Sequence, residues 1–159
     1  MLQSPHDQRW YWFGESRKEG SSGQGDKQGI NCYSSATIAG PWRNEGQVLA
    51  QSDIHVTGAH GPWIMQRPKV IYNNNTMKFV MYFHLDQPKS SPAQPVPQPP
   101  RPARHSEEPL SYQFRRVGVA TAHKASGPYT FIHGVQPDGV PSLDMNLFQD
   151  NRPHPRLWC

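Results

Sequence analysis

The chain has 159 residues, about the size of one domain, and 35% of them are hydrophobic. Its 17 prolines and 13 glycines argue against long helices and favour many short strands joined by turns. The net charge is only +4 and the basic residues are scattered, so no nucleic-acid partner is expected. No run approaches the roughly 20 apolar residues of a membrane span, so no membrane partner is expected either.

Cysteine and histidine offer no metal site in the sequence. Cys32 and Cys159 are too few for a disulfide framework and lack the spacing of metal ligands. None of the eight histidines is paired at the short spacing of a zinc site. We therefore expect neither a metal nor another cofactor. The first residues contain no apolar stretch, so no signal peptide is visible and the compartment stays unknown.

Short runs of β-forming residues follow one another along the chain. Residues 14–29 are polar and rich in glycine, which predicts a loop. Asparagines at 73–75 tolerate the left-handed backbone of a tight turn and predict a hairpin there. The predicted strands cover residues 10–13, 30–35, 42–49, 69–72, 78–84, 117–122, 129–132 and 145–148.

One strand-turn-strand unit occurs twice. Residues 30–42 and 117–129 both pass from a β-rich run through small hydroxyl residues and a polar loop to Gly-Pro-aromatic. Such a repeat is typical of architectures built from one repeated unit. The copies at Gly40 and Gly127 lie further apart than the ~40–50 residues of one propeller blade. The spacing therefore requires an insertion between them.

The insertion is visible at residues 88–109, where proline, glutamine, serine and arginine dominate. Proline donates no hydrogen bond to a β ladder, so this stretch cannot form a central strand. Residues 99–104 fit Pro-x-x-Pro-x-Arg, so a domain that recognises proline could bind at 95–104. The plainer interpretation is a surface insertion. Without it, the repeat fits a β-propeller with four-stranded blades.

Six motifs occur in order between residues 10 and 151: Tyr11-Trp-Phe-Gly-Glu15, Ile30-Asn-Cys-Tyr-Ser-Ser35, Arg67-Pro-Lys-Val-Ile-Tyr-Asn73, Lys78-Phe-Val-Met81, Val117-Gly-Val-Ala-Thr121 and Asp144-Met-Asn-Leu-Phe148. Together they resemble glycoside hydrolase family 43, in particular its galactan 1,3-β-galactosidase-like branch. The resemblance implies an all-β fold, a partial five-bladed β-propeller of about two blades plus the start of a third. Residues 1–151 would form this incomplete domain around the insertion, and residues 152–159 a divergent tail.

The same resemblance implies hydrolysis of O-glycosidic bonds with inversion, on a β-1,3-galactan-type poly- or oligosaccharide. Glu15 matches a sugar-contacting acid, with a solvated loop carboxylate as the alternative. Asp144 matches an acid of the central cavity, with a turn-capping role as the alternative. Tyr112 matches a substrate-contacting aromatic residue, and Trp63 could stack on a sugar ring, although both could simply pack in the fold.

Gln66 stands where the family pattern has a glutamate. An inverting glycosidase needs a carboxylic acid and a carboxylate base about 6.5–9.5 Å apart. An amide cannot ionise, so Gln66 can only hydrogen-bond to a substrate in this position. The family's general acid lies in a segment beyond this sequence, and only nine residues precede Trp10, so a strand and the acid are expected to be missing. We therefore expect an impaired hydrolase or, alternatively, a non-catalytic carbohydrate-binding or protein-interaction module; family members are often secreted.

Overall fold

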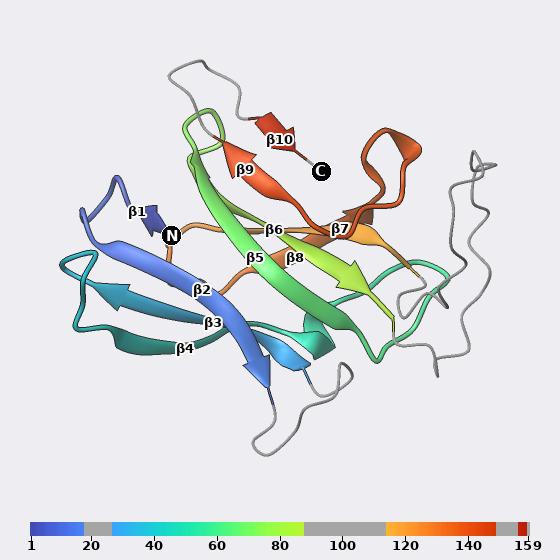
Figure 1. Ribbon diagram of the computed structural model, residues 1–159, viewed down its shortest axis with the longest axis horizontal. Helices are drawn as coiled ribbons and strands as arrows, with labels where there is room; N and C mark the ends of the chain where they lie inside the picture. The colour runs from blue at the N-terminus through green and yellow to red at the C-terminus, as the bar shows by residue number, and fades with distance from the viewer. Residues whose placement is uncertain (18–26, 88–113, 149–155, 159) are drawn as a thin grey trace, which may run out of the picture.

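The computed structural model describes residues 1–17, 27–87, 114–148 and 156–158 (Figure 1). This part of the chain is all β, as the sequence predicts. Two short 3-10 helices, η2 (Gln51–Asp53) and η3 (Pro137–Gly139), interrupt it. The strands are β1 (Leu2–Gln3), β2 (Trp10–Arg17), β3 (Lys27–Ser35), β4 (Arg43–Ala50), β5 (Ile64–Asn73), β6 (Lys78–Asp86), β7 (Arg116–Ala122), β8 (Thr130–Val135), β9 (Asn146–Phe148) and β10 (Arg156–Trp158).

The strands form two four-stranded sheets and one hairpin. The first sheet has the order β1-β2-β3-β4 and the second the order β5-β6-β7-β8, with every neighbouring pair antiparallel. Strands β9 and β10 pair with each other, and β10 lies within residues 152–159. Such consecutive antiparallel order is the order of strands within a propeller blade. The described sheets do not close into a ring.

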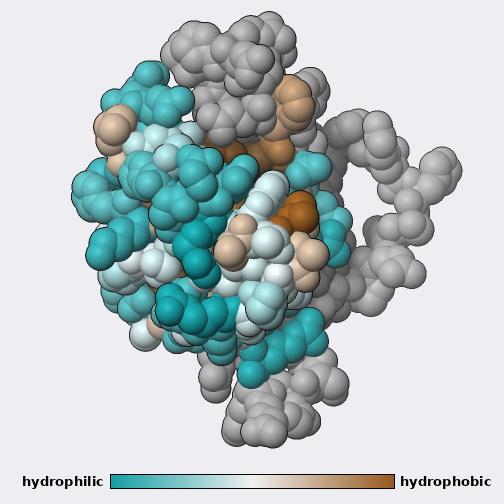
Figure 2. All heavy atoms as spheres, turned by 90° about the vertical axis from the view of Figure 1, so that its left-hand side faces the viewer, coloured by the Kyte–Doolittle hydropathy of each residue, from teal (hydrophilic) through white to brown (hydrophobic). Residues whose placement is uncertain are grey.

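The two sheets pack through a shared hydrophobic core. In β2 the side chains alternate, so Tyr11 and Phe13 are buried whereas Trp12 is 50% exposed. Phe13 meets Tyr129, which leads into β8, edge to face with ring centroids 6.1 Å apart. Every second residue of β6 is fully buried on the face toward this core: Phe79, Met81, Phe83 and Leu85. The side of the molecule in Figure 2 is mainly hydrophilic, with brown atoms in small areas.

The sequence repeat occupies equivalent places in the two sheets. In the first sheet it covers the turn from β3 to β4, where the Gly40 amide donates to the Thr37 carbonyl at 3.1 Å. In the second it covers the turn from β7 to β8, where the Gly127 amide donates to the Lys124 carbonyl at 3.0 Å. Both glycines have a positive φ, 95° and 74°, which favours glycine.

Strands β1, β2, β3 and β5 differ from the sequence predictions. Residues 14–17 and 27–29 are strand rather than loop, because β2 and β3 continue to pair up to Arg17 and Lys27. The residues before Trp10 do contain a strand, β1, which pairs with Trp10 and Tyr11. Strand β5 begins at Ile64 rather than at Lys69, since residues 64–66 pair with the end of β6. A bulge separates them from the pairing that resumes at Lys69.

Some predictions lie outside the described residues. The proline-rich insertion at 88–109, with the proposed recognition site at 95–104, and Tyr112 both belong to this group. Among the residues that the structure describes, no helix is both long enough and apolar enough to span a membrane.

Candidate functional site

Three elements distant in sequence meet at Arg67. Strand β5 contacts both β2 and β9 and lies between them in Figure 1. Arg67 sits in the β5 bulge with a left-handed φ of 51°, and Pro68 follows it without an amide hydrogen to donate. A bulge changes the direction of the side chains around it, which is common beside functional sites. The local sequence thus turns Arg67 out of the ladder.

Two carboxylates predicted from the sequence converge on this arginine. The Arg67 amide donates to Oε1 of Glu15 at 3.2 Å, and the guanidinium Nη1 forms an ion pair with Oδ2 of Asp144. Glu15 also accepts from Arg17 at 3.3 Å. The side chains of Arg67 and Asp144 are 56% and 66% exposed. We call Arg67, Glu15 and Asp144 the arginine cluster. It can offer hydrogen-bond acceptors and a donor to a dissolved polyhydroxylated ligand.

The side chain of Gln66 contacts His84 inside the second sheet. It is 7% exposed, and its Oε1 lies 3.3 Å from Nδ1 of His84. Nε2 of His84 lies 3.1 Å from Oδ2 of Asp86. The structure thus places Gln66 in a buried polar chain, next along the strand to the arginine cluster.

Asp86 is the hub of that chain. Its Oδ1 accepts from the amides of Gln87 and Phe114, at 2.8 and 2.5 Å, and its Oδ2 accepts from the Arg115 amide at 3.1 Å as well as contacting His84. Burial acts to raise the pKa of this carboxyl, but the hydrogen bonds from His84 and the backbone outweigh burial, and the pKa is lowered. Asp86 is therefore a carboxylate that joins the end of β6 to the start of β7.

Trp63 is 3% exposed and packs against Phe114, with ring centroids 5.5 Å apart. Its carbonyl accepts from Nε2 of Gln51 at 2.5 Å. Residues 51, 52 and 54–63 line an open pocket of about 820 Å³, and Trp63 is one of them. The surroundings of Trp63 are those of a packing residue, and stacking on a sugar stays a prediction.

A second pocket, of about 400 Å³, lies between the first strands of the sheets and β9. The half-exposed Trp12 lines it together with Lys69 and Asn146. An aromatic ring beside a cation and an amide suits a sugar, which has apolar and hydroxylated faces. No pattern in the sequence marks these residues as a ligand site, because only tertiary contact brings them to one pocket.

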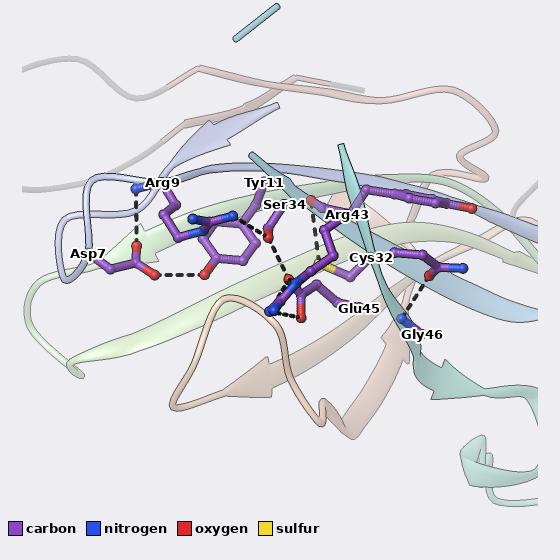
Figure 3. Close-up of polar contacts among 10 residues, drawn as sticks. Asp7, Arg9, Tyr11, Cys32, Ser34, Arg43, Glu45 and Gly46 are labelled. Atoms are coloured by element: carbon purple, nitrogen blue, oxygen red, sulfur yellow. Dashed lines mark hydrogen bonds and ion pairs between the residues drawn. The ribbon is translucent and has the colours of Figure 1, made fainter. Parts of the chain in front are cut away.

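A separate polar network lies in the first sheet (Figure 3). Ser34 donates to Oε1 of Glu45 at 2.5 Å, Arg9 donates to Ser34 at 3.0 Å, and Arg43 binds both Glu45 oxygens at 2.9 Å. The hydrogen bond from Ser34 is the largest cause of a lowered pKa for Glu45, and Arg43 lowers it further. Because these groups satisfy one another, the network is well suited to holding β3 and β4 together.

Cys32 offers no nucleophile. Its thiol is fully buried and contacts the Tyr33 carbonyl at 3.9 Å. Burial, with a contribution from Glu45, raises the pKa of the thiol to about 12. Within the described ranges, no three or more His, Cys, Asp or Glu residues are grouped so that they could hold a metal ion.

Arg67→Met tests whether the arginine cluster serves binding rather than folding. Because the Arg67–Asp144 pair is exposed, we expect the free energy of unfolding to change by less than about 1 kcal/mol. If a sugar binds at this cluster, the loss of the cation should weaken that binding at least about tenfold. Urea unfolding and oligosaccharide titration measure the two effects, and a large loss of stability with unchanged binding would contradict this expectation.

The known proteins to which this chain is similar are proteins of solved structure. No protein-family profile matches the chain, and no curated protein sequence matches it. The chain is similar to a Bifidobacterium bifidum s17 protein assigned as an exo-β-1,3-galactanase, with TM-score 0.66 and 27% identity over 94% of this chain. It is also similar to an exo-β-1,3-galactanase from Phanerochaete chrysosporium with galactose, with TM-score 0.66 and 29% identity over 95% of this chain.

A family 43 β-1,3-galactosidase with galactodeoxynojirimycin is 35% identical over 81% of this chain, with TM-score 0.55. This chain spans 40%, 28% and 31% of these three proteins in turn, less than half of each. The sheets and these similarities place the chain in the class of glycoside hydrolase domains related to β-propellers. Within that class, the chain is similar to part of the β-1,3-galactosidases and exo-β-1,3-galactanases of glycoside hydrolase family 43.

Proposed function

We propose that this chain supplies part of the substrate site of a glycoside hydrolase that cleaves O-glycosidic bonds in a β-1,3-galactan-type poly- or oligosaccharide. The observation that carries the proposal is the meeting of Glu15 and Asp144 at Arg67. Two similar proteins support the substrate class: one is assigned as an exo-β-1,3-galactanase, and the other is an exo-β-1,3-galactanase with galactose bound.

Each residue of the cluster, and each further candidate from the sequence, has a role in this proposal. The carboxylates of Glu15 and Asp144 accept hydrogen bonds from sugar hydroxyls, and the exposed Arg67 guanidinium donates to ring or hydroxyl oxygens. Gln66 hydrogen-bonds to substrate at the position of the family glutamate, while Tyr112 and Trp63 contribute aromatic surface. Since Gln66 cannot ionise, we propose that hydrolysis by this chain is impaired.

We also propose that each four-stranded sheet is one blade of a five-bladed propeller and that β9 begins a third blade. Consecutive antiparallel order in both sheets supports this assignment. Residues 1–151 then form the propeller portion, residues 88–109 a proline-rich insertion, and residues 152–159 a divergent tail. The insertion could bind a proline-recognition domain at 95–104.

The second candidate is a non-catalytic carbohydrate-binding or protein-interaction module. The amide at position 66 favours it, because an amide can bind a hydroxyl group without acting as an acid or base. A hydrolase and a carbohydrate-binding module both predict sugar binding and differ in turnover, whereas a protein-interaction module predicts no sugar binding.

Titration of the purified chain with β-1,3-galactobiose, followed by tryptophan fluorescence, tests both candidates. Trp12 lines the 400 Å³ pocket and is 50% exposed, so we expect its emission to change on binding. Xylobiose serves as the control sugar and should cause a smaller change. No response to galactobiose would contradict the proposal, and binding without release of galactose would favour the non-catalytic module.

A further inference from the structure

The buried chain of Gln66, His84 and Asp86 runs directly behind the arginine cluster. Gln66 and His84 are register partners on β5 and β6, and all three side chains are at least nine-tenths buried. The contacts are 3.3 Å from Gln66 to Nδ1 of His84 and 3.1 Å from Nε2 of His84 to Asp86. The histidine therefore connects the amide to the carboxylate through its two ring nitrogens.

Asp86 determines which ring nitrogen must carry a proton. Both of its oxygens already accept from backbone amides, and an ionised carboxylate has no proton to give. The contact with His84 is thus a hydrogen bond only if Nε2–H donates to Asp86. Nδ1 then remains as the atom that faces residue 66.

Glutamine suits this position for a reason that glutamate does not share. Its amide holds an acceptor and a donor, so it can pair with Nδ1 whether or not that nitrogen carries a proton. An ionised glutamate only accepts, so it would require a proton on Nδ1 as well as on Nε2. With Oε1 at 3.3 Å from Nδ1, a hydrogen bond needs a proton on Nδ1; beside a neutral ring protonated at Nε2, the Gln66 amide is turned so that its NH₂ group donates to Nδ1. Glutamine at 66 thus keeps a hydrogen bond in either case and removes the need for a charged histidine.

We propose that His84 and Asp86 are positioning residues that fix the side chain of Gln66 and, through it, the bulge that presents Arg67. Gln66 is the last residue paired with β6 before the bulge. A hydrogen bond at this point limits the freedom of the next residue, which carries both contacts to Glu15 and Asp144. The part of this inference that concerns sugar binding rests on the proposed function.

Long-range ¹H–¹⁵N NMR of the histidine rings tests the hydrogen-bond order in the full chain. We expect His84 to show a protected proton on Nε2, whereas His133, exposed on β8, should show no protected ring proton. Gln66→Glu should add a second protected proton, on Nδ1 of His84. An unprotonated Nε2 in the wild type, or a His84 ring that is unchanged by Gln66→Glu, would overturn the proposal.

Two variants of the histidine separate positioning from packing. His84→Asn keeps a donor near the place of Nδ1, beside Gln66, whereas His84→Gln keeps one near the place of Nε2, beside Asp86. We expect His84→Gln to weaken galactobiose binding about tenfold, as the loss of one hydrogen bond would. His84→Asn should retain most of the wild-type affinity. His133→Gln is the matched control and should bind as the wild type does.

The outcomes distinguish this inference from the proposed function. If the wild type binds galactobiose but both folded His84 variants bind equally well, or both are equally weakened, the positioning role is wrong. If the wild type does not bind, the proposed function fails, and the ring-proton pattern alone then decides whether the hydrogen-bond chain exists. Near-ultraviolet circular dichroism confirms that each variant is folded, and the NMR measurement on the wild type and Gln66→Glu needs no His84 variant.

Discussion

Asp86→Asn should lower the free energy of unfolding by about 3–5 kcal/mol, the cost of breaking a buried charged group that its partners surround. The asparagine has the same shape, but its NH₂ group would face backbone amide donors from Gln87 and Phe114 or from Arg115. Two donors that face each other leave both unsatisfied in the interior. Urea unfolding followed by tryptophan fluorescence measures the loss.

The same change should alter the dependence of stability on pH. The pKa of Asp86 is lowered in the folded chain, so its contribution is present above the ordinary value of 3.8 and is lost as the pH falls below it, through the folded value. The difference between wild type and Asp86→Asn should therefore be largest near neutral pH and shrink in acid. Asp138→Asn, at an exposed aspartate, should change stability by less than about 0.5 kcal/mol. A constant difference down to pH 2 would contradict the assignment.

Gly118→Ala should destabilise the fold by about 2–3 kcal/mol, as overpacking of a core does. Gly118 on β7 lies opposite Phe83 on β6, and a Cβ at this glycine would overlap the fully buried Phe83 ring. Gly14→Ala on β2 is the matched control, because a Cβ there meets no atom within 4 Å. Thermal and urea unfolding compare the two variants, and equal stability would show that the ring moves freely.

A double variant tests the stated cause. Phe83→Leu alone should cost about 1 kcal/mol or more by leaving space in the core. Together with Gly118→Ala, the total loss should be smaller than the sum of the single losses, because the smaller side chain makes room for the new methyl group. Additive losses would point to a backbone cause instead.

Residue patterns alone predict an all-β chain and most of its strands. The aromatic run at residues 10–13 predicts a strand through its β propensity, and the structure adds that Tyr11 and Phe13 are buried whereas Trp12 is exposed. The Gly-Pro-aromatic repeat marks the same turn in both sheets, since each copy combines a glycine of positive φ with a following proline and ring. Glu15 and Asp144 were selected by their motifs, and both reach the arginine cluster.

The contacts of these residues arise from the tertiary structure. Arg67 becomes the centre of the cluster through a bulge, and Gln66 joins His84 through the register of β5 on β6. Asp86 meets the amide of Phe114, 28 positions further along the chain. Such contacts depend on the pairing and register of distant segments, which the β preference of single residues does not encode. The propensities of neighbouring residues therefore predict strands, whereas the site needs those strands to be assembled.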